Sequence, residues 1–322
     1  MNCLYCGNPL DRDADTVSGW HRRCARRFFG GAAVPEISIT ADDLEAFARR
    51  NVQAGLTVPG VQRKMSLHLD GQARPYRLML VGYPAGYILK PAAPEYRELP
   101  EFEHTVMSLA DVAGIRTVPH GLVHLASGEP AYITRRVDRN GSTRVPMEDL
   151  CQLSERLTDD KYRSSCEQCG KTIGRYSDRP GLDLADYFFL LLFCFVTGNA
   201  DMHLKNFSLI RGAGGWVLAP AYDLLPTNLL IPEDRDETAL TINGKRSRLR
   251  YRDFLACGRT IGLIDTVIER LTARIVERAN RFPETIERSH LSTENRKALE
   301  SLVAERVAVL RDVMNRDPVA QG

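Results

Sequence analysis

The stretch "FVTGNADMHLKNFSLI", residues 195–210, places a short polar loop between two apolar segments. A mostly apolar run reaches Gly198, and an acid, a histidine, a lysine and an asparagine then follow within six positions before apolar residues return. Rigid placement of polar groups between buried elements matters in catalysis, because a small displacement can cost about 10²-fold in rate. The stretch therefore predicts a functional loop between a buried helix and a strand.

The polar residues of this loop have the spacing of a phosphoryl-transfer site. Asp201 and Asn206 lie five positions apart, and Asp223 follows a predicted hairpin that returns it to the same end. Such a site needs one carboxylate for the hydroxyl proton, an asparagine for metal and a second aspartate that reaches phosphate through Mg²⁺. Lys205 is a candidate ligand of the γ-phosphate, and His203 is expected to fix the loop by hydrogen bonding. Taken alone, Asp201 would be read as a turn residue.

Length and composition are those of a globular protein. The 322 residues suffice for two lobes with a sizeable core, and 43% hydrophobic with 26% charged residues is ordinary for such chains. The 43 basic and 41 acidic residues leave a formal charge of +2, which gives no global field for nucleic acid or an anionic membrane. Any affinity for anions must therefore be local.

The chain shows no targeting or membrane pattern. The N-terminal sequence lacks the basic and then apolar pattern of a signal peptide. The most apolar segment, 184–196, is about two-thirds of the roughly 20 residues that cross a bilayer. Eight cysteines, several in metal-like spacings, indicate reduced thiols rather than a disulfide framework. We therefore expect a cytoplasmic protein with no membrane contact.

Residues 1–36 are expected to form a small segment around four metal-binding side chains. Cys3 and Cys6 are spaced C-x2-C, and His21 and Cys24 follow after 14 residues as H-x2-C. This spacing suits tetrahedral Zn²⁺. The segment is too small to form a core, so a bound metal would supply the folding energy. The alternative is a frayed terminus with ordinary cysteines and histidine.

Residues 37–147 predict a β-rich region with one prominent helix. After a short helix that starts at Thr40, a glycine-bearing loop feeds the alternating run "KMSLHL", and its N–H groups could contact phosphate or simply form a hairpin turn. Lys90 ends the apolar strand "GYILKPA", and "HGLVHLA" and "AYITRRVDR" are two further strands. Between "GYILKPA" and "HGLVHLA", residues 99–114 predict an amphipathic helix with glutamates in its first turn.

Residues 148–322 predict a helical region. Long helical patterns cover 184–198, 253–281 and 293–316, and the hairpin of short strands follows the first of them. A second C-x2-C pair at Cys166 and Cys169 has no further ligands near it in the sequence. Glycine loop, lysine, acid-bearing helix and acidic loop thus follow one another in the order of a bilobal, protein-kinase-like α+β fold, with a small β-rich lobe before a large helical lobe.

Seven segments resemble the HipA-type serine/threonine kinase toxins of bacterial toxin–antitoxin modules. In order, they are "TVPGVQRK", "YILKP", "LPEFEHTVMSLA", "YITRRVDR", "EDLCQL", "GNADMHLKNFSLI" and "PAYD". The resemblance covers roughly residues 50–230, and "GNADMHLKNF" is its most specific element. It implies a kinase that transfers the γ-phosphate of ATP to a serine or threonine of a target protein.

The resemblance also implies roles for individual residues. Asp201 matches the catalytic aspartate, Asn206 and Asp223 match the Mg²⁺-binding pair, and Lys90 matches the lysine that holds the ATP phosphates. Glu103, or failing it Glu101, is expected to pair with Lys90. The mobile glycine-rich loop of the family is matched by Thr57, Val58, Gly60, Val61 and Gln62. A serine of that loop is autophosphorylated in the family, and Thr57 stands at its place here.

Partners follow from the same resemblance. Longer family members begin with an extra N-terminal subdomain, and this chain has only the Cys/His knuckle there. It therefore resembles the short, HipT-like branch, which lacks that subdomain. That branch implies two antitoxin proteins, a small one like the missing subdomain and a DNA-binding one. Known targets of the family include aminoacyl-tRNA synthetases.

Two functions from other classes remain open. A small-molecule phosphotransferase could use the same aspartate and asparagine. A non-catalytic module could contact nucleic acid through the knuckle and the basic run "GKRSRLR", residues 244–250. We interpret that run mainly as a solvated hairpin and do not expect direct contact with nucleic acid.

Overall fold

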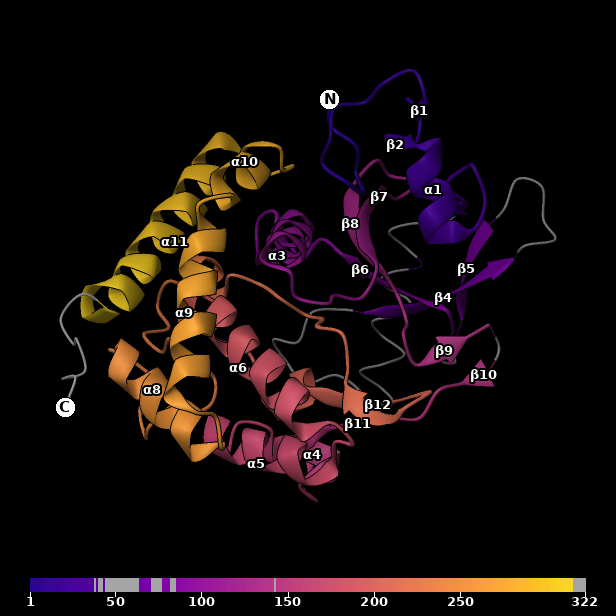
Figure 1. Cartoon of the computed structure of the whole chain (residues 1–322). Coiled ribbons are helices and arrows are strands. Elements are labelled where there is room, and N and C mark those ends of the chain that lie inside the picture. The colour runs from indigo at the N-terminus through magenta and orange to yellow at the C-terminus, as the bar shows by residue number, and fades with distance from the viewer. Residues whose placement is uncertain are drawn as a thin grey trace, which may run out of the picture. The chain divides into compact units, whose positions relative to one another are not determined.

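The computed structural model describes residues 1–37, 39, 43, 64–70, 77–81, 85–141 and 143–314. The chain divides into two compact units with a mixed α+β fold, whose elements are labelled in Figure 1. Unit 1 comprises Met1–Thr105, Val118–Arg144 and Arg288–Leu291, and unit 2 comprises Val106–Thr117, Val145–Glu287 and Ser292–Gly322. Of the helix predicted to start at Thr40, the structure describes only Asp43, which is helical, and the glycine-bearing loop, 57–62, lies outside the described residues.

Unit 1 is built on a six-stranded sheet with the strand order β3-β5-β4-β6-β8-β7. Only β3 and β5 pair in parallel. Side chains alternate along β4, where Met65 and Leu67 are buried and His68 is exposed, as expected for a strand with one face on the core. The predicted strands "KMSLHL", "GYILKPA", "HGLVHLA" and "AYITRRVDR" are confirmed. The bounds are β3 Glu36–Ile37, β4 Met65–Asp70, β5 Arg77–Val81, β6 Tyr87–Pro91, β7 His120–His124 and β8 Pro130–Arg135, with a separate hairpin of β9 Arg139–Asn140 and β10 Thr143–Arg144.

Helix α3, Leu99–Ala113, is the predicted amphipathic helix. Its apolar stripe is buried as expected, from Phe102 to Ala113. The helix ends at Gly114, whose φ of 86° lies in the left-handed region that favours glycine. The helix starts in unit 1 and continues into unit 2, so the residues of its first turns belong with the sheet.

The N-terminal segment packs on the edge strand β7. It contains β1 Ala14–Asp15, β2 Trp20–His21 and helix α1 Arg22–Phe29. Trp20 is fully buried, and its indole Nε1–H donates to the carbonyl of Leu122 at 2.9 Å. The rings of Tyr5, Phe28 and Phe29 surround Trp20, and their centroids lie 5.1, 5.5 and 5.4 Å from the centroid of the indole. The rings of Phe28 and Phe29 also contact each other, with centroids 4.7 Å apart. The segment therefore shares its aromatic core with the sheet.

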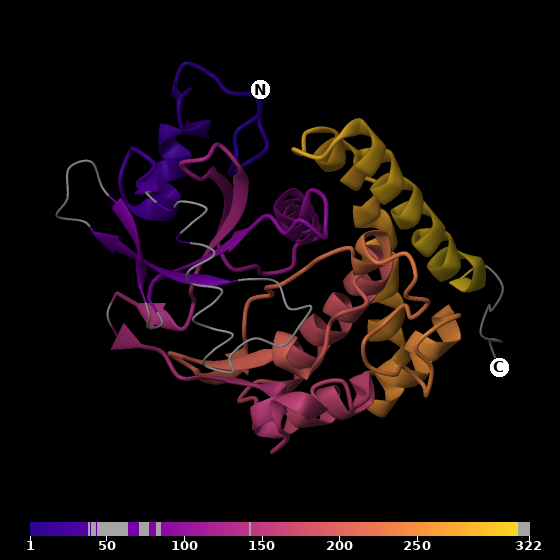
Figure 2. The ribbon, with the colours of Figure 1, turned by 180° about the vertical axis from the view of Figure 1, so that it is seen from behind.

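Unit 2 is organised around helix α6, Pro180–Val196. Its residues from Tyr187 to Val196 are buried on every side, as expected for a helix inside a lobe. Pro180 occupies the first turn, where its missing N–H costs nothing. Figures 1 and 2 show α6 among other helices, and it packs against α5, α9 and α11. The bounds are α4 Leu150–Leu153, α5 Cys166–Tyr176, α7 Thr227–Leu230, α8 Tyr251–Thr260, α9 Asp265–Ala279, α10 Phe282–Glu287 and α11 Thr293–Met314, with 3-10 turns η1 Thr158–Asp160 and η2 Leu204–Asn206.

A three-stranded antiparallel sheet completes unit 2. It has the order β11-β12-β13, with β11 Met147–Asp149, β12 Ser208–Gly212 and β13 Gly215–Leu218. The hairpin β12–β13 is the predicted one, whereas β11 falls where the sequence indicated only a change to helices. The buried carboxylate of Asp183 on α6 accepts a hydrogen bond from the Leu218 N–H at 2.8 Å. This bond ties the end of the hairpin to α6.

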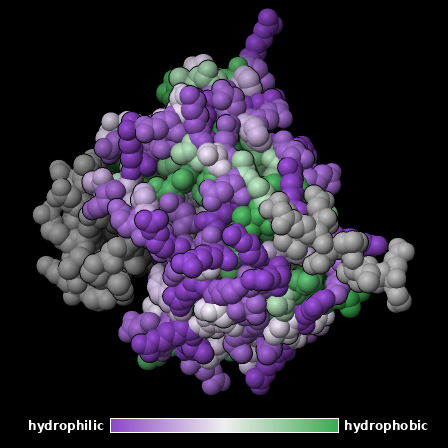
Figure 3. Space-filling model, turned by 90° about the vertical axis from the view of Figure 1, so that its left-hand side faces the viewer, coloured by the Kyte–Doolittle hydropathy of each residue, from purple (hydrophilic) through white to green (hydrophobic). Residues whose placement is uncertain are grey.

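The helical predictions differ from the structure in their boundaries. The pattern 253–281 is divided into α8 and α9 by a turn at Gly262, whose φ is 95°. Helix α5 lies in a stretch that the sequence shows only as polar and mixed. Within the described part of the chain, no helix is long and apolar enough to cross a membrane. The molecular face in Figure 3 is mostly hydrophilic, with small separate hydrophobic patches.

Candidate active site

The polar loop begins where α6 ends. The Thr197 hydroxyl donates to the Phe193 carbonyl at 2.9 Å, and Gly198 follows with a φ of 69°. This φ lies in the left-handed region that favours glycine, and a Cβ atom at Gly198 would also lie 2.5 Å from Cδ2 of Leu302. The chain then passes through η2 into β12. The loop is therefore fixed at both ends by buried elements, as its sequence predicts.

Asp201 is the exposed acid of this loop. Its backbone N–H donates to Oδ1 of Asn199 at 3.2 Å, and Asn199 itself is buried. The protein that crowds around the carboxyl group raises the pKa of Asp201 by desolvation, and the charge of Asp223 raises it further. A hydrogen bond from Tyr162 acts in the opposite direction. The carboxylate of Asp201 is thus accessible, and its pKa lies above that of an ordinary aspartate.

Tyr162 is a residue of this site that the sequence did not indicate. Its hydroxyl donates to Oδ1 of Asp201 at 2.7 Å, and its ring packs edge-on to His203 with centroids 5.0 Å apart. Its backbone carbonyl accepts from Arg246 Nη2 at 3.0 Å. The neighbouring Lys161 carbonyl accepts from the Leu204 N–H at 3.2 Å. Tyr162 lies in a polar stretch of the sequence without periodicity, and such a stretch does not indicate which residues its side chains contact.

Asn206 is buried beside Asp201. Its side-chain Nδ2 donates to the backbone carbonyl of Asp201 at 3.0 Å, which closes the loop on itself. Among the described residues no donor contacts its Oδ1. An amide oxygen that is oriented in this way suits Mg²⁺, which prefers oxygen ligands.

Asp223 adopts a left-handed backbone conformation, with a φ of 62°, just beyond β13. The hydroxyl of the preceding Tyr222 contacts the Lys205 carbonyl at 2.9 Å and the Ser208 hydroxyl at 2.6 Å. These bonds hold the segment after the hairpin against the residue that precedes Asn206. The charge of Asp223 also raises the pKa of both Asp201 and His203. The structure thus brings Asp201, Asn206 and Asp223 together.

His203 and Lys205 are the two other polar residues of the loop. Nδ1 of His203 is buried and has no hydrogen-bond partner in the described part of the chain. Burial, with the nearby charge of Lys161, lowers its pKa to about 4, so the ring is neutral near pH 7. The hydrogen bonds by which His203 holds the loop come from its backbone, because its N–H donates to the Asp201 carbonyl and its carbonyl accepts from the Asn206 N–H, both at 2.9 Å. Its ring packs edge-on to Tyr162. Lys205 Nζ forms an ion pair with Asp149 Oδ2 at 2.8 Å.

In unit 1, Lys90 and Glu103 form a buried ion pair. Lys90 Nζ lies 2.6 Å from Glu103 Oε1, and the side chains are 9% and 0% exposed. Strand β6 positions the lysine, and α3 positions the glutamate. The ammonium group also lies 5.5 Å from the ring centroid of Tyr132, which pairs with Lys90 across β6 and β8. Burial raises the pKa of Glu101, which the sequence left as the second choice.

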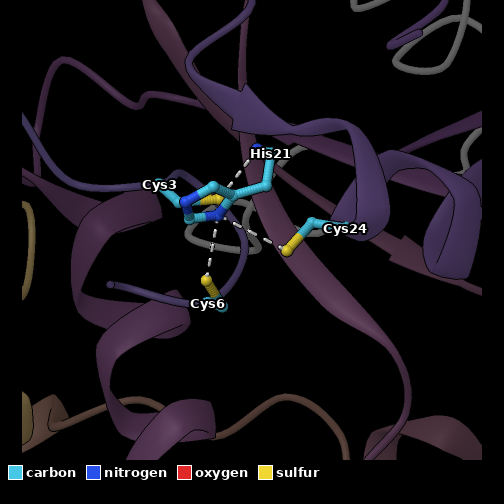
Figure 4. A group of neighbouring side chains, drawn as sticks. All are labelled: Cys3, Cys6, His21 and Cys24. Atoms are coloured by element: carbon cyan, nitrogen blue, oxygen red, sulfur yellow. Dashed lines mark hydrogen bonds between the residues drawn. The ribbon is translucent and has the colours of Figure 1, made fainter. Parts of the chain in front are cut away.

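The four residues of the predicted knuckle lie together in unit 1. The ligand atoms of Cys3, Cys6, His21 and Cys24 are all within 4.8 Å of one another. Figure 4 shows the imidazole of His21 facing the three sulfur atoms. This placement is the one that their spacing predicts.

The second C-x2-C pair and the basic run 244–250 lie outside the candidate site. Cys166 and Cys169 are buried in α5, where burial raises the pKa of both thiols, and they belong to no metal-like cluster of the described residues. In the basic run 244–250, Lys245 Nζ pairs with Asp253 at 2.7 Å and Arg246 lies 3.9 Å from Asp236. Part of the positive charge of this run is therefore neutralised.

Residues 56–285 match the family model of the HipA-like C-terminal domain. Two proteins of Sinorhizobium fredii, named "Putative kinase Y4mE" and "Putative kinase Y4dM", are 33% and 30% identical over 225 and 222 residues. These matches cover 65% and 64% of this chain but 52% and 53% of the relatives, so the chain spans about half of their length. A "Putative kinase" of Haemophilus influenzae is 26% identical over 288 residues, or 80% of this chain and 82% of that protein.

Two solved structures have a similar fold. The toxin HipA of Shewanella oneidensis, from a complex with HipB and operator DNA, gives a TM-score of 0.65 at 21% identity and covers 86% of this chain and 71% of its own. The proinflammatory kinase CtkA of Helicobacter pylori gives a TM-score of 0.55 at 16% identity and covers 74% of this chain and 89% of its own. At these identities the likeness concerns the fold.

Proposed function

Because the chain belongs to the HipA-like C-terminal domain family, we propose that it is a toxin-type serine/threonine protein kinase of a bacterial toxin–antitoxin module. The observation that carries the proposal is the meeting of Asp201, Asn206 and Asp223 around one loop of unit 2. The buried Lys90–Glu103 pair of unit 1 supports it. In this proposal residues 37–147 serve as the small β-rich lobe and 148–322 as the large helical lobe of a protein-kinase-like fold.

Asp201 acts on the substrate hydroxyl. Its carboxylate orients the hydroxyl group and accepts its proton as the oxygen attacks the γ-phosphorus of ATP. The new O–P bond forms while the bond to the β-phosphate oxygen breaks, and ADP leaves. The raised pKa of Asp201 makes it a stronger base than an ordinary carboxylate. The hydrogen bond of Asn206 to the Asp201 carbonyl keeps the base in place.

The other residues stabilise phosphate charge. Asn206 Oδ1 and the Asp223 carboxylate supply oxygen ligands of the kind that Mg²⁺ prefers. When bound, Mg²⁺ neutralises the charge that develops on the phosphate oxygens. Lys90 contacts the phosphates of ATP, and Glu103 holds the lysine side chain in one orientation. The ammonium group of Lys205 is held in an ion pair with Asp149.

The target and the regulation of the kinase are finer parts of the proposal. By resemblance to its family the chain phosphorylates a serine or threonine of a protein, with aminoacyl-tRNA synthetases as the first candidates. Thr57 is the proposed site of autophosphorylation, and this assignment rests on the sequence "TVPGVQRK" alone. The HipA structure that resembles this chain contains HipB and DNA, which supports a DNA-binding antitoxin as partner.

The test compares phosphoproteomes of cells that express the wild-type chain or the Asp201→Ala variant. We expect new phosphoserine or phosphothreonine peptides, and Thr57 phosphate, only with the wild type. Glu305→Ala, which removes an exposed acid on α11, is the matched control and should behave like the wild type. Equal phosphopeptides in wild type and Asp201→Ala, or label from γ-labelled ATP in small molecules alone, would overturn the proposal.

A further inference from the structure

We propose that Cys3, Cys6, His21 and Cys24 form a structural zinc site that fastens the first residues of the chain to the segment Arg288–Leu291. This inference is independent of the proposed kinase activity. It rests on the geometry of the four ligand atoms, on the hydrogen bonds around His21 and on the contacts of residues 2–8 within unit 1.

The distances between ligand atoms fit a tetrahedral zinc ion. Zinc binds thiolate sulfur at about 2.3 Å and imidazole nitrogen at about 2.0–2.1 Å, so a tetrahedron places sulfur and nitrogen about 3.5 Å apart. His21 Nδ1 lies 3.5 Å from Cys6 Sγ and 3.8 Å from Cys24 Sγ. All four ligand atoms lie within 4.8 Å of one another. The set therefore needs only small shifts to enclose the ion.

The orientation of His21 is already that of a zinc ligand. Its Nε2 lies 3.1 Å from the Pro9 carbonyl and 3.7 Å from Asp11 Oδ1. These acceptors place the ring proton on Nε2, which leaves the lone pair of Nδ1 directed at the sulfur atoms (Figure 4). Metal-bound histidines commonly donate their other N–H to a carbonyl or carboxylate in this way.

The backbone around the cysteines is shaped as a knuckle. The Cys3 N–H donates to the Asn8 carbonyl at 2.8 Å, and the Gly7 N–H donates to the Cys3 carbonyl at 2.9 Å. Gly7, directly after the second cysteine, has a φ of 67°. The His21 N–H also donates to Cys3 Sγ at 3.5 Å. The turn holds both sulfur atoms on one side.

The site is a closed one. Cys3, His21 and Cys24 are buried, and the cysteines are free thiols. Four protein ligands complete a tetrahedron and leave no position for water or substrate, which is the arrangement of structural rather than catalytic zinc. Three thiols and an imidazole gathered in a segment of this size are stabilised by a metal, since structural zinc contributes folding free energy.

The same knuckle contacts the residues that connect α10 to α11. Asn2 Nδ2 donates to the Arg288 carbonyl at 2.8 Å, and Arg288 Nη1 donates to Asn8 Oδ1 at 3.3 Å. The ring of His290, which is half-buried, lies against the backbone of Cys3. Residues on both sides of the Cys3–Cys6 turn thus hold Arg288–Leu291, a segment that belongs to unit 1. Loss of zinc should loosen this attachment.

Metal analysis of the purified full-length chain, without a histidine tag, tests the site. We expect about one zinc per chain, the stoichiometry of a mononuclear site, and near-complete loss of zinc in Cys3→Ser/Cys24→Ser. Cys166→Ala/Cys169→Ala alters the other C-x2-C pair and should keep the metal. A wild-type chain that neither carries zinc nor takes it up would overturn the proposal.

X-ray absorption spectroscopy of the wild-type chain keeps the proposal falsifiable if the cysteine variant fails to fold. The expected shell has three sulfur atoms and one nitrogen, and any other sulfur count contradicts the assigned ligands. Hydrogen exchange before and after chelation then tests the attachment. Exchange should rise in residues 2–8 and 288–291 but not in α5, and unchanged exchange at 288–291 would overturn the fastening role.

Discussion

The hydroxyl of Tyr162 donates a hydrogen bond of 2.7 Å to Oδ1 of Asp201. The two residues are 39 positions apart, and the bond joins the segment after η1 to the proposed catalytic loop. A substrate hydroxyl would approach Asp201 as the same kind of donor. Tyr162 therefore influences both the access to the carboxylate and its protonation.

Tyr162→Phe is expected to shift the pH dependence of the kinase. Desolvation by the surrounding protein and the charge of Asp223 raise the pKa of Asp201, whereas the Tyr162 hydrogen bond lowers it. Without the hydrogen bond this pKa rises, so less Asp201 is ionised at a given acidic pH. The acid limb of kcat/KM should move to higher pH, as measured by initial rates across a pH series. Tyr176→Phe, on α5, is the matched control, and an acid limb that stays in place or moves to lower pH in Tyr162→Phe contradicts the proposal.

Lys90→Met is expected to destabilise the chain and to weaken ATP binding. It leaves the Glu103 carboxylate buried without its 2.6 Å partner, and breaking a buried pair costs about 3–5 kcal/mol. In Lys90→Met/Glu103→Met the buried charge is gone, so most of this stability should return while ATP affinity stays at least about tenfold reduced. Urea unfolding and calorimetric titration with ATP measure the two effects.

The control for this pair is Lys171→Met, an exposed lysine on α5, which should change neither quantity. A double variant as unstable as Lys90→Met would show that the uncompensated glutamate is not the cause. Wild-type ATP affinity in either variant would remove Lys90 from the phosphate site.

Asn206→Ala is expected to raise the Mg²⁺ requirement of the kinase. It removes both the Oδ1 ligand and the hydrogen bond to the Asp201 carbonyl. The Mg²⁺ concentration for half-maximal rate should rise about tenfold or more, which corresponds to roughly 1.4 kcal/mol. Asn206→Asp keeps an oxygen ligand but loses the amide donor, so it should retain more of the metal affinity than alanine. Asn280→Ala is the control, and an unchanged Mg²⁺ dependence in Asn206→Ala would exclude the residue as a ligand.

Gly121→Val is expected to destabilise unit 1. A Cβ atom at Gly121 would lie 2.8 Å from Cζ2 of the buried Trp20, and overpacking typically costs about 1–3 kcal/mol. Thermal unfolding in the presence of zinc measures the loss. Gly86→Ala is the control, because among the described residues beyond its chain neighbours no atom lies within 4 Å of its added Cβ. Equal unfolding temperatures for both variants would show that the indole can move away.

Local patterns of the sequence identified most elements that position the site. Alternation along 64–69 and the helical period of 99–114 predicted β4 and α3, since each pattern depends only on which face meets the core. Helix α5 and strand β11 were missed. Helix α5 begins at a serine cap in a polar run, and β11 is too short for a period to show.

Local sequence patterns were sufficient to identify the candidate residues for the chemistry, because Asp201 and Asn206 share one loop and the two Cys/His pairs have metal-like spacings. The structure confirms Glu103, the first choice from the sequence, as the partner of Lys90. The contact of Tyr162 with Asp201 and the direction of His21 Nδ1 toward the sulfur atoms could be seen only in the folded chain. These outcomes depend on the packing of segments far apart in the chain. A short-range pattern fixes the face on which a side chain lies, whereas its partner depends on how whole elements come together.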